Sequence, residues 1–310
     1  MSKKTFKTLD EQVEILRGKG LIINNVEKAE RILLRENYFF INGYRHLFMK
    51  SSKDSVFIPG TTFEELYAMF IFDRRVRNIF FKNLLIIENN IKSLISYQLS
   101  KKYGYREKEY LNVKNFTKDP MKTRQVHDVL NKVKRQIRVN GKQHSATMHY
   151  MTNYGYIPLW ILVKVLSFGI VGELYGILDT DDKVEISRLY NIDVETLIIY
   201  LSILANYRNL CAHEDILYNH RTQKVIPDCR FHQELNIDMT DGEYNYGKND
   251  LFSVVIIFKQ MLSESEFRDF VNEVGYEIDI LEGKSNTVPI NNFLNKIGFP
   301  DNWREILEIE

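Results

Sequence analysis

The sequence predicts an all-α protein built around a few long helices. The chain has 310 residues but only six prolines and 15 glycines, which is few for a protein rich in turns. Apolar residues recur every three or four positions through most of the chain, the spacing that gives a helix one buried face. Hydrophobic residues make up 44% and charged residues 27%, close to the globular norm, so wholesale disorder is excluded.

The N-terminal helices are expected to be short. Apolar spacing predicts helices over 9–17 and 26–36, the first capped by Thr8 or Asp10. An aromatic, irregular segment follows, and a loop ending at Pro59-Gly60 separates it from the rest of the chain.

A capped start at residues 61–65 then opens the principal scaffold element. Its apolar pattern runs to about residue 103, as one long helix or as two with a small break. A second strong helix is expected over 119–138, and Asn140-Gly141 ends it. The remaining helices are expected, in order, at 158–165, 169–178, 193–212, 251–261, 267–280 and 289–297. Residues 219–248 are polar and irregular.

Three segments follow from this reading. They are an N-terminal helical and aromatic segment (1–60), a helical domain (61–265) and a C-terminal helical extension (266–310). The two cysteines cannot form a disulfide framework and fit a reducing compartment. No apolar signal core follows the basic N-terminus, and no apolar run approaches the roughly 18 residues that span a bilayer. We therefore expect a cytoplasmic protein with no membrane segment.

Charge is balanced overall but not along the chain. Lys+Arg is 42 and Asp+Glu is 41, and the net charge of +1 identifies no polyanionic partner. The helix expected over 119–138 is nevertheless basic, with the single acid Asp128 in residues 122–142. The basic residues there are Lys122, Arg124, Lys132, Lys134, Arg135, Arg138 and Lys142. Because one apolar stripe of this helix is buried, the basic residues face outward as a candidate anion-binding face.

The residues that carry chemistry lie at the end of the helix expected over 193–212. Arg208, Asn209 and His213 fall within its last turns. Histidine takes and gives protons near neutral pH, and arginine presents a fixed fork of donors to phosphate. Asn209 could orient the imidazole or bind a phosphate oxygen. Without a metal, this set best fits RNA cleavage, because the 2′-hydroxyl supplies the nucleophile.

The spacing poses a geometric problem. Arg208 and His213 are five residues apart, which is about 140° around an ideal helix. The long arginine side chain, an unwound last turn or a second copy of the helix must therefore close the gap. A simpler interpretation stays open, because an Arg and a His near a helix C-terminus also complement its dipole and cap free carbonyls.

The segment Tyr207-Arg208-Asn209-Leu210-Cys211-Ala212-His213 resembles the signature of the Abi-like (AbiD/AbiF-type) abortive infection proteins. That family belongs to the HEPN superfamily, whose hallmark is an Arg, four to six residues and then a His. Four other segments resemble the family in the same order: 38–44 (aromatic, with Gly-Tyr), 72–88 (beginning Phe-Asp-Arg-Arg), 158–169 (Pro-Leu-Trp to Ser-Phe-Gly) and 298–303 (Gly-Phe-Pro-Asp-Asn-Trp).

The resemblance implies a HEPN-type helical bundle with smaller N-terminal and C-terminal helical additions. It implies a metal-independent endoribonuclease without a cofactor, a homodimer that brings two Arg–His pairs into one cleft, and a toxin-like role in anti-phage defence. RNA is then the substrate, and a small antitoxin-like RNA is a candidate regulator. By position, Arg208 stabilises the phosphate, His213 is the acid and base, and Asn209 is their polar companion.

Supporting roles follow from the same resemblance, with two departures. Tyr218-Asn219 matches an aromatic-Asn pair that an Arg often follows directly, whereas here His220 precedes Arg221. A Glu-x3-Arg pattern of the first helix is represented by Glu88 and Lys92. Asn219 and Glu88 are therefore expected as supporting residues. Arg221 is expected to bind RNA together with Lys122, Arg124, Lys132, Lys134, Arg135 and Arg138.

Histidine, cysteine and aromatic residues in the chain suggest other kinds of site, which the sequence does not favour. His213, His220, Cys229 and His232 lie close in sequence, but their spacing matches no familiar zinc motif, so no metal site is expected. Cys211 is expected to be a packing residue. The aromatic residues at 38–48 are expected to pack in a core rather than stack on bases, and Trp160 and Trp303 are expected as packing anchors.

Two alternatives to the ribonuclease stay open. One is a non-catalytic RNA- or protein-binding module with the same fold. The other is a toxin silenced by nucleotidyl or adenylyl transfer to Tyr207 or to another tyrosine near the motif.

Overall fold

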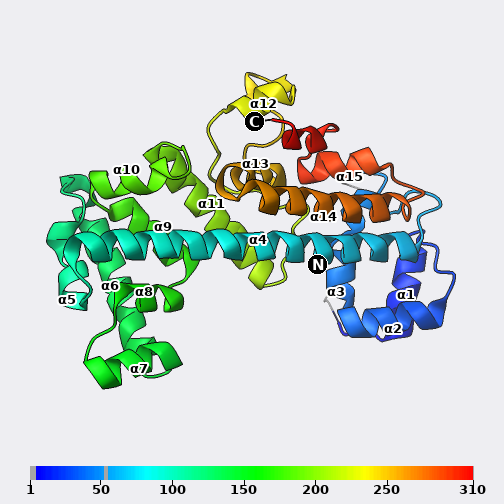
Figure 1. The fold of residues 1–310 in the computed structure, drawn as a ribbon. Helices are drawn as coiled ribbons and strands as arrows, with labels where there is room; N and C mark the ends of the chain where they lie inside the picture. Colours follow the sequence, from blue (N-terminus) through cyan, green and yellow to red (C-terminus); the bar gives the residue numbers. More distant parts are fainter. Residues whose placement is uncertain (1–4, 52–54, 310) are drawn as a thin grey trace.

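The computed structural model describes residues 5–51 and 55–309, and it is all-α (Figure 1). Helices account for 67% of these described residues. They are α1 (Leu9–Gly18), α2 (Val26–Glu36), α3 (Tyr38–Asn42), α4 (Phe63–Tyr103), α5 (Glu107–Tyr110), α6 (Thr123–Asn140), α7 (Ser145–Tyr154), α8 (Leu159–Leu162), α9 (Phe168–Ile177), α10 (Thr180–Arg188), α11 (Val194–Ala212), α12 (Arg230–Glu234), α13 (Leu251–Met261), α14 (Glu264–Glu282) and α15 (Ile290–Ile297). Short 3₁₀ helices lie at Arg45–Phe48, Val113–Asn115, Pro120–Lys122, Val163–Val165 and Trp303–Leu307.

Helix α4 is the spine of the molecule. Its 41 residues form one unbroken helix, about 60 Å long at 1.5 Å per residue. Thr62 caps its start in a capping box with Glu65, as the sequence predicts. The same Glu65 accepts hydrogen bonds from the backbone of Asn286 (2.8 Å) and Thr287 (2.7 Å), which fastens the C-terminal segment to the start of α4.

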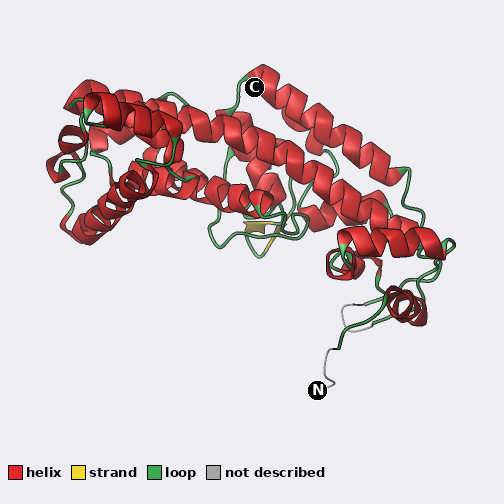
Figure 2. Cartoon of the chain, turned by 90° about the horizontal axis from the view of Figure 1, so that it is seen from below, coloured by secondary structure: helices red, strands yellow, loops and turns green. Residues whose placement is uncertain are grey.

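The other helices pack along this spine (Figures 1 and 2). Helices α1 to α3 lie at one end of α4, and α5, α6, α9 and α10 lie at the other. Helix α14 runs along α4, and α11 crosses it and also packs on α9. The ring of Phe80 on α4 lies 5.0 Å from Phe270 of α14 and 5.7 Å from Phe258 of α13, so an aromatic cluster joins these three helices. This packing places the end of α11 against the middle of α4.

Most predicted helices are present, but some begin at other residues than expected. Helix α14 begins at Glu264 rather than at residue 267. Helix α6 begins at Thr123 rather than at residue 119, because Asp119 caps a separate 3₁₀ turn that opens with Pro120. Helices α3, α5, α7 and α10 lie in stretches for which no helix was predicted. The irregular stretch 219–248 contains α12 and two-residue antiparallel strands, β1 (Met239–Thr240) and β2 (Glu243–Tyr244).

The predicted division into three segments stays a prediction. Its boundary between residues 265 and 266 falls inside α14, near that helix's start. Part of the predicted N-terminal segment, residues 1–4 and 52–54, lies outside the described residues, as does residue 310.

Candidate functional site

A buried carboxylate holds Arg208 against α4. The Nε of Arg208 donates to Oε2 of Glu88 at 3.0 Å, and Nζ of Lys92 donates to Oε1 of Glu88 at 2.7 Å. The guanidinium carbon lies 5.8 Å from the ring centroid of Phe81. Glu88 is buried, whereas 28% of the Arg208 side chain is exposed. Within the described residues, the terminal nitrogens of Arg208 make no hydrogen bond. One edge of the guanidinium is therefore fixed, and the outer edge is available to an anion.

His213 terminates α11 and is exposed. Its backbone N–H donates to the carbonyl of Asn209 at 3.0 Å, and its side chain makes no hydrogen bond within the described part of the chain. Glu214 then takes a left-handed conformation with φ 57°. Its N–H bonds the carbonyl of Cys211, and the N–H of Asp215 bonds that of Leu210. These two bonds form a Schellman turn in which a glutamate occupies the position that glycine usually fills, at a cost of about 1 kcal/mol.

The turn after His213 is anchored on α4 by Asp73 and Arg77. Arg77 donates from Nη1 to the carbonyl of Asp215 at 2.9 Å and to Oδ2 of Asp73 at 3.1 Å. Asp73 accepts hydrogen bonds from the backbone of Leu217 (3.2 Å) and Tyr218 (2.7 Å). Burial raises the pKa of the Asp73 carboxyl, and the neighbouring Arg77 partly offsets this.

Tyr44 completes this buried network. Its hydroxyl donates to Asp73 at 2.8 Å, and its ring lies 5.5 Å from that of Tyr218. The sequence predicts Tyr44 only as one of the packed aromatic residues and Arg77 only as a candidate extension of the basic face, and it predicts no role for Asp73. All three lie in segments that resemble the family. Their polar side chains within apolar surroundings were the signal, but their partners lie far away in sequence.

The structure does not bring Arg208, Asn209 and His213 into contact within one chain. Helix α11 is regular up to Ala212, so the last turn is not unwound. The hydrogen bond to Glu88 holds the side chain of Arg208 against α4, so this side chain does not extend toward His213. Asn209 is exposed and its side chain makes no hydrogen bond within the described residues. In this conformation neither the arginine side chain nor an unwound last turn closes the angular gap.

The neighbouring predicted residues lie on the loop after α11. Asn219 is exposed and has no side-chain hydrogen bond in the part described. Arg221 donates to the backbone carbonyls of His220 (3.0 Å) and Lys296 (2.9 Å), so its donors are partly occupied. Nε2 of His220 lies 2.6 Å from Oδ1 of Asn206 on α11. Burial, and then the charge of Arg221, lower the pKa of His220.

The basic residues predicted to face outward from α6 fall into two groups, one with ion pairs and one without ion pairs among the described residues. Lys132 bonds Glu173 at 2.7 Å, and Arg124 lies 3.9 Å from Asp128. Lys122 lies in the 3₁₀ turn before α6. In the C-terminal half of α6, the exposed side chains of Lys134, Arg135 and Arg138 have no ion pair among the described residues. The free positive charge is thus concentrated at one end of the helix.

No metal site is assembled from the predicted histidines and cysteines. Among the described residues, no group of three or more His, Cys, Asp or Glu side chains could hold a metal ion. His232 is buried and bonds the carbonyl of Gly247 at 2.9 Å, while its other ring nitrogen lies 3.2 Å from Sγ of Cys229. Burial raises the pKa of the Cys229 thiol, and it raises that of Cys211 to about 12, so both thiols stay protonated at neutral pH.

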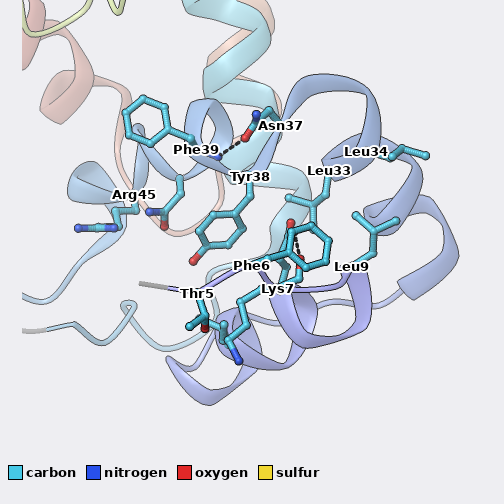
Figure 3. A pocket seen from close by; sticks show the side chains of 13 residues that line it. Thr5, Phe6, Lys7, Leu9, Leu33, Leu34, Asn37, Tyr38, Phe39 and Arg45 are labelled. Carbon is cyan, nitrogen blue, oxygen red and sulfur yellow. Dashed lines mark hydrogen bonds between the residues drawn. The ribbon is translucent and has the colours of Figure 1, made fainter. Parts of the chain in front are cut away.

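Two predictions about aromatic residues need correction, and one is confirmed. Phe39 is 75% exposed and Phe40 is 48% exposed, so only part of the 38–48 segment packs in a core. Together with Phe6 and Tyr38, Phe39 lines an apolar pocket between residues 5–7 and helices α1 to α3 (Figure 3). Trp160 is 44% exposed and is not a buried anchor, whereas Trp303 is buried as predicted.

The tyrosine-acceptor alternative also meets an obstacle. Tyr207 is fully buried and its hydroxyl donates to the carbonyl of His220 at 3.3 Å. Tyr218 is buried as well. Neither phenol is accessible for covalent modification in this conformation.

A comparison with known protein families shows which family the chain belongs to. The family model described as Abi-like protein matches residues 31–219, which is more than half of the sequence. The chain belongs to the Abi-like protein family. The match begins inside α2, runs through α11 and ends just after the loop that Asp73 anchors. Membership of the Abi-like family fits a general role in abortive infection, the defence of a cell population against phage.

Other comparisons add no relative. No curated protein and no solved structure matches this chain. Within the described residues, none of the helices combines the length and the apolar character that a bilayer crossing requires.

Proposed function

We propose that this Abi-like protein is a metal-independent endoribonuclease of the HEPN type that acts in abortive infection. The observation that supports this proposal best is the position of the Arg208 guanidinium. Buried Glu88 orients it and its outer edge is free. An exposed histidine, His213, follows five residues later. Lys92 balances the charge of Glu88, so the cluster keeps a net charge of +1 for a phosphate.

The proposed reaction uses the RNA's own nucleophile. The 2′-hydroxyl attacks the adjacent phosphorus, and the bond from phosphorus to the 5′-oxygen of the next nucleotide breaks. His213 takes the proton from the 2′-hydroxyl and passes it to the departing 5′-oxygen. Arg208 stabilises the negative charge on the crowded phosphate, and Asn209 donates to one of its oxygens. The products carry a 2′,3′-cyclic phosphate and a 5′-hydroxyl.

The proposed active unit is a homodimer. Arg208 faces α4 while His213 projects from the end of α11, about 140° away around the helix. Two copies of α11 that meet near their C-termini would place the arginine of one chain beside the histidine of the other. The exposure of Asn209 and His213 supports an interface at this end of α11.

A cleavage assay with a chelator tests the reaction. We expect the purified protein to cut mixed single-stranded RNA in excess EDTA, and RNA with 2′-O-methyl groups throughout to stay intact. Arg208→Ala and His213→Ala should each reduce cleavage at least about 100-fold, the usual contribution of such groups. His46→Ala, which removes an exposed histidine far from α11 in sequence, serves as the matched control. If both site variants cut as well as His46→Ala, these roles are wrong.

Mixing the two inactive variants tests the shared site. When Arg208→Ala and His213→Ala chains exchange at random, half of the dimers are mixed. Each mixed dimer has one complete site if arginine and histidine come from different chains. Equimolar mixing should therefore restore about a quarter of the parent rate, by subunit symmetry. No recovery despite proven subunit exchange would place each pair within one chain.

A second candidate function rests on the ion pair itself. The bond between Arg208 and Glu88 also joins α11 to α4, as a purely structural pair would. A non-catalytic RNA- or protein-binding module would keep this bond and need no cleavage. RNA binding that survives both substitutions, with no product ever detected, would favour this candidate. Control by a small antitoxin-like RNA stays a prediction under either function.

A further inference from the structure

An exposed aromatic cluster lies on α7 and on the segment between α4 and α5, at the end of the molecule where α5, α6 and α7 lie (Figure 1). Neighbouring ring centroids are 5.4 Å (Tyr105 to Tyr156), 6.2 Å (Tyr156 to Tyr154) and 5.3 Å (Tyr154 to Tyr150) apart. Tyr154 is 57% exposed and Tyr105 is 43% exposed. Large aromatic side chains that stay in contact with each other and with water are unusual for packing residues.

The guanidinium of Arg106 and the imidazole of His149 belong to the cluster. The guanidinium carbon of Arg106 lies 5.8 Å from the ring centroid of Tyr105 and 5.6 Å from that of Tyr156. The imidazole of His149 lies 5.6 Å from the ring of Tyr150 and 6.0 Å from that of Tyr154. Arginine stacked on tyrosine is a surface that nucleic-acid bases also favour.

The cluster is held in place by buried hydrogen bonds. The hydroxyl of Tyr110 donates to the carbonyl of Ile157 at 2.7 Å, and the N–H of Ile157 donates to Glu107 at 2.5 Å. Gly155, with φ 74°, ends α7 in a left-handed turn between Tyr154 and Tyr156. The rings are therefore presented by a fixed turn rather than by a mobile loop. Fixed rings lose little conformational freedom when a ligand binds.

Unpaired positive charge adjoins these rings. Lys108 of α5 lines a shallow groove with Lys134 and Arg138 of α6, against the single acid Glu107. The carboxylate of Glu107 already accepts the bond from the backbone of Ile157. Lys134 and Arg138 belong to the half of α6 that has no ion pair among the described residues. The surface thus combines base-stacking rings with phosphate-binding cations, the pattern that recognises single strands.

We propose that this aromatic platform, made of Tyr105, Arg106, His149, Tyr150, Tyr154 and Tyr156, binds single-stranded nucleic acid by stacking consecutive bases. Lys134 and Arg138 contact its phosphates. The choice of RNA as the natural strand rests on the proposed ribonuclease function, but the binding surface does not depend on it. As a separate anchoring site, it would hold a long strand while another part of that strand reaches the end of α11.

Fluorescence anisotropy tests the platform in a chain that cannot cut. The probe is a labelled 20-nucleotide mixed-sequence RNA without secondary structure, and the background is Arg208→Ala with His213→Ala. Tyr154→Ala should weaken binding about tenfold, the equivalent of one lost stacking contact. Tyr276→Ala, which removes an equally exposed tyrosine from α14, is the matched control and should bind like the background. Tyr154→Phe should also bind like the background, because stacking uses the ring face.

Further arms separate stacking from charge and from catalysis. Lys134→Gln with Arg138→Gln should lower the slope of log affinity against log salt by about 1.4, at about 0.7 per phosphate contact. An RNA duplex should bind far more weakly than the single strand, and single-stranded DNA of the same sequence should bind comparably to RNA. In the parent background, Tyr154→Ala should cut a dinucleotide normally but a long RNA more slowly.

The outcomes distinguish this proposal from the ribonuclease. Lost binding in Tyr154→Ala, with normal binding in Tyr154→Phe, supports the platform even if no cleavage is ever found. Unchanged binding in Tyr154→Ala and in the folded double variant Tyr105→Ala/Tyr154→Ala would overturn the platform, whether or not the protein cuts RNA. Equal loss in Tyr154→Phe, or equal binding of the duplex, would also overturn it.

Discussion

Removing the carboxylate of Asp73 should destabilise the fold and disturb the turn that carries His213. Four donors meet at this buried side chain: Tyr44, Arg77 and the backbone of Leu217 and Tyr218. Asp73→Ala leaves the guanidinium of Arg77, which is 3% exposed, without its carboxylate. Breaking a buried ion pair from one side costs about 3–5 kcal/mol, and each unsatisfied backbone donor costs about 1–3 kcal/mol.

These costs are not additive, because the surroundings relax, so we expect about 4 kcal/mol in total. Asp73→Asn keeps the volume and one good acceptor but turns an amide toward a donor, and should cost about 2 kcal/mol. Urea unfolding followed by far-ultraviolet circular dichroism measures both. Asp128→Ala, an exposed aspartate on α6, is the control and should change stability by at most about 0.5 kcal/mol.

The same variants test the link between this network and the site. At temperatures where Asp73→Asn is fully folded, RNA cleavage should still fall, since the backbone after His213 loses its anchor. A loss of less than about 1 kcal/mol in Asp73→Ala would refute the argument that the buried charges depend on each other. Normal cleavage by folded Asp73→Asn would refute the positioning role while leaving the stability argument intact.

Three further predictions concern other buried or strained groups. Burial raises the pKa of Asp250 from 3.8 to about 6, so the contribution of this carboxyl to stability is fully present below about pH 3.8 and is lost as pH rises through 6. Relative to Asp250→Asn, the free energy of unfolding should fall by about 2 kcal/mol between pH 4 and pH 7. If urea unfolding shows the same change between the two pH values in the parent and in the variant, this prediction is contradicted. Cys211, whose pKa burial raises to about 12, should react with iodoacetamide at pH 8 only after unfolding, and rapid native labelling seen by mass spectrometry would be contrary to its packing. Glu214→Gly should raise stability by up to about 1 kcal/mol by relieving the left-handed φ of 57°, and a lower Tm would argue against strain at this turn.

Local sequence signals predicted the helices that have recognisable capping residues or a long apolar pattern. The capping box at Thr62 and the acids at the start of α11 mark helix starts that the structure keeps, and long apolar periodicity sets the extent of α4. Helix α7 was not predicted because its polar and apolar residues do not separate onto opposite faces of the helix. The hairpin of β1 and β2 carried a usable signal, since Asp241-Gly242 with positive φ at both residues is a typical two-residue turn.

The residue types of the site could be predicted, but their partners could not. Arg208 and His213 stand out because charged groups follow an apolar helix, which is visible in a short window of sequence. The bond from Arg208 to Glu88 spans 120 residues, and those from Asp73 to the loop after His213 span 144 and 145. Such pairings depend on how α11 crosses α4. The exposure of Trp160 and Phe39 likewise depends on which neighbours cover them, and apolar character alone does not determine it.

The departure from Glu-x3-Arg at Glu88 and Lys92 changes the chemistry of the cluster less than the sequence suggests. Lys92 lies one helical turn beyond Glu88 and donates to one carboxylate oxygen, which leaves the other oxygen for Arg208. If Arg208 were the only partner of Glu88, the two charges would cancel and little attraction for a phosphate would remain. With Lys92 present, the three groups carry a net charge of +1, and Arg208 is the most exposed of them. The buried lysine therefore keeps Arg208 oriented and still electrostatically available to an anion.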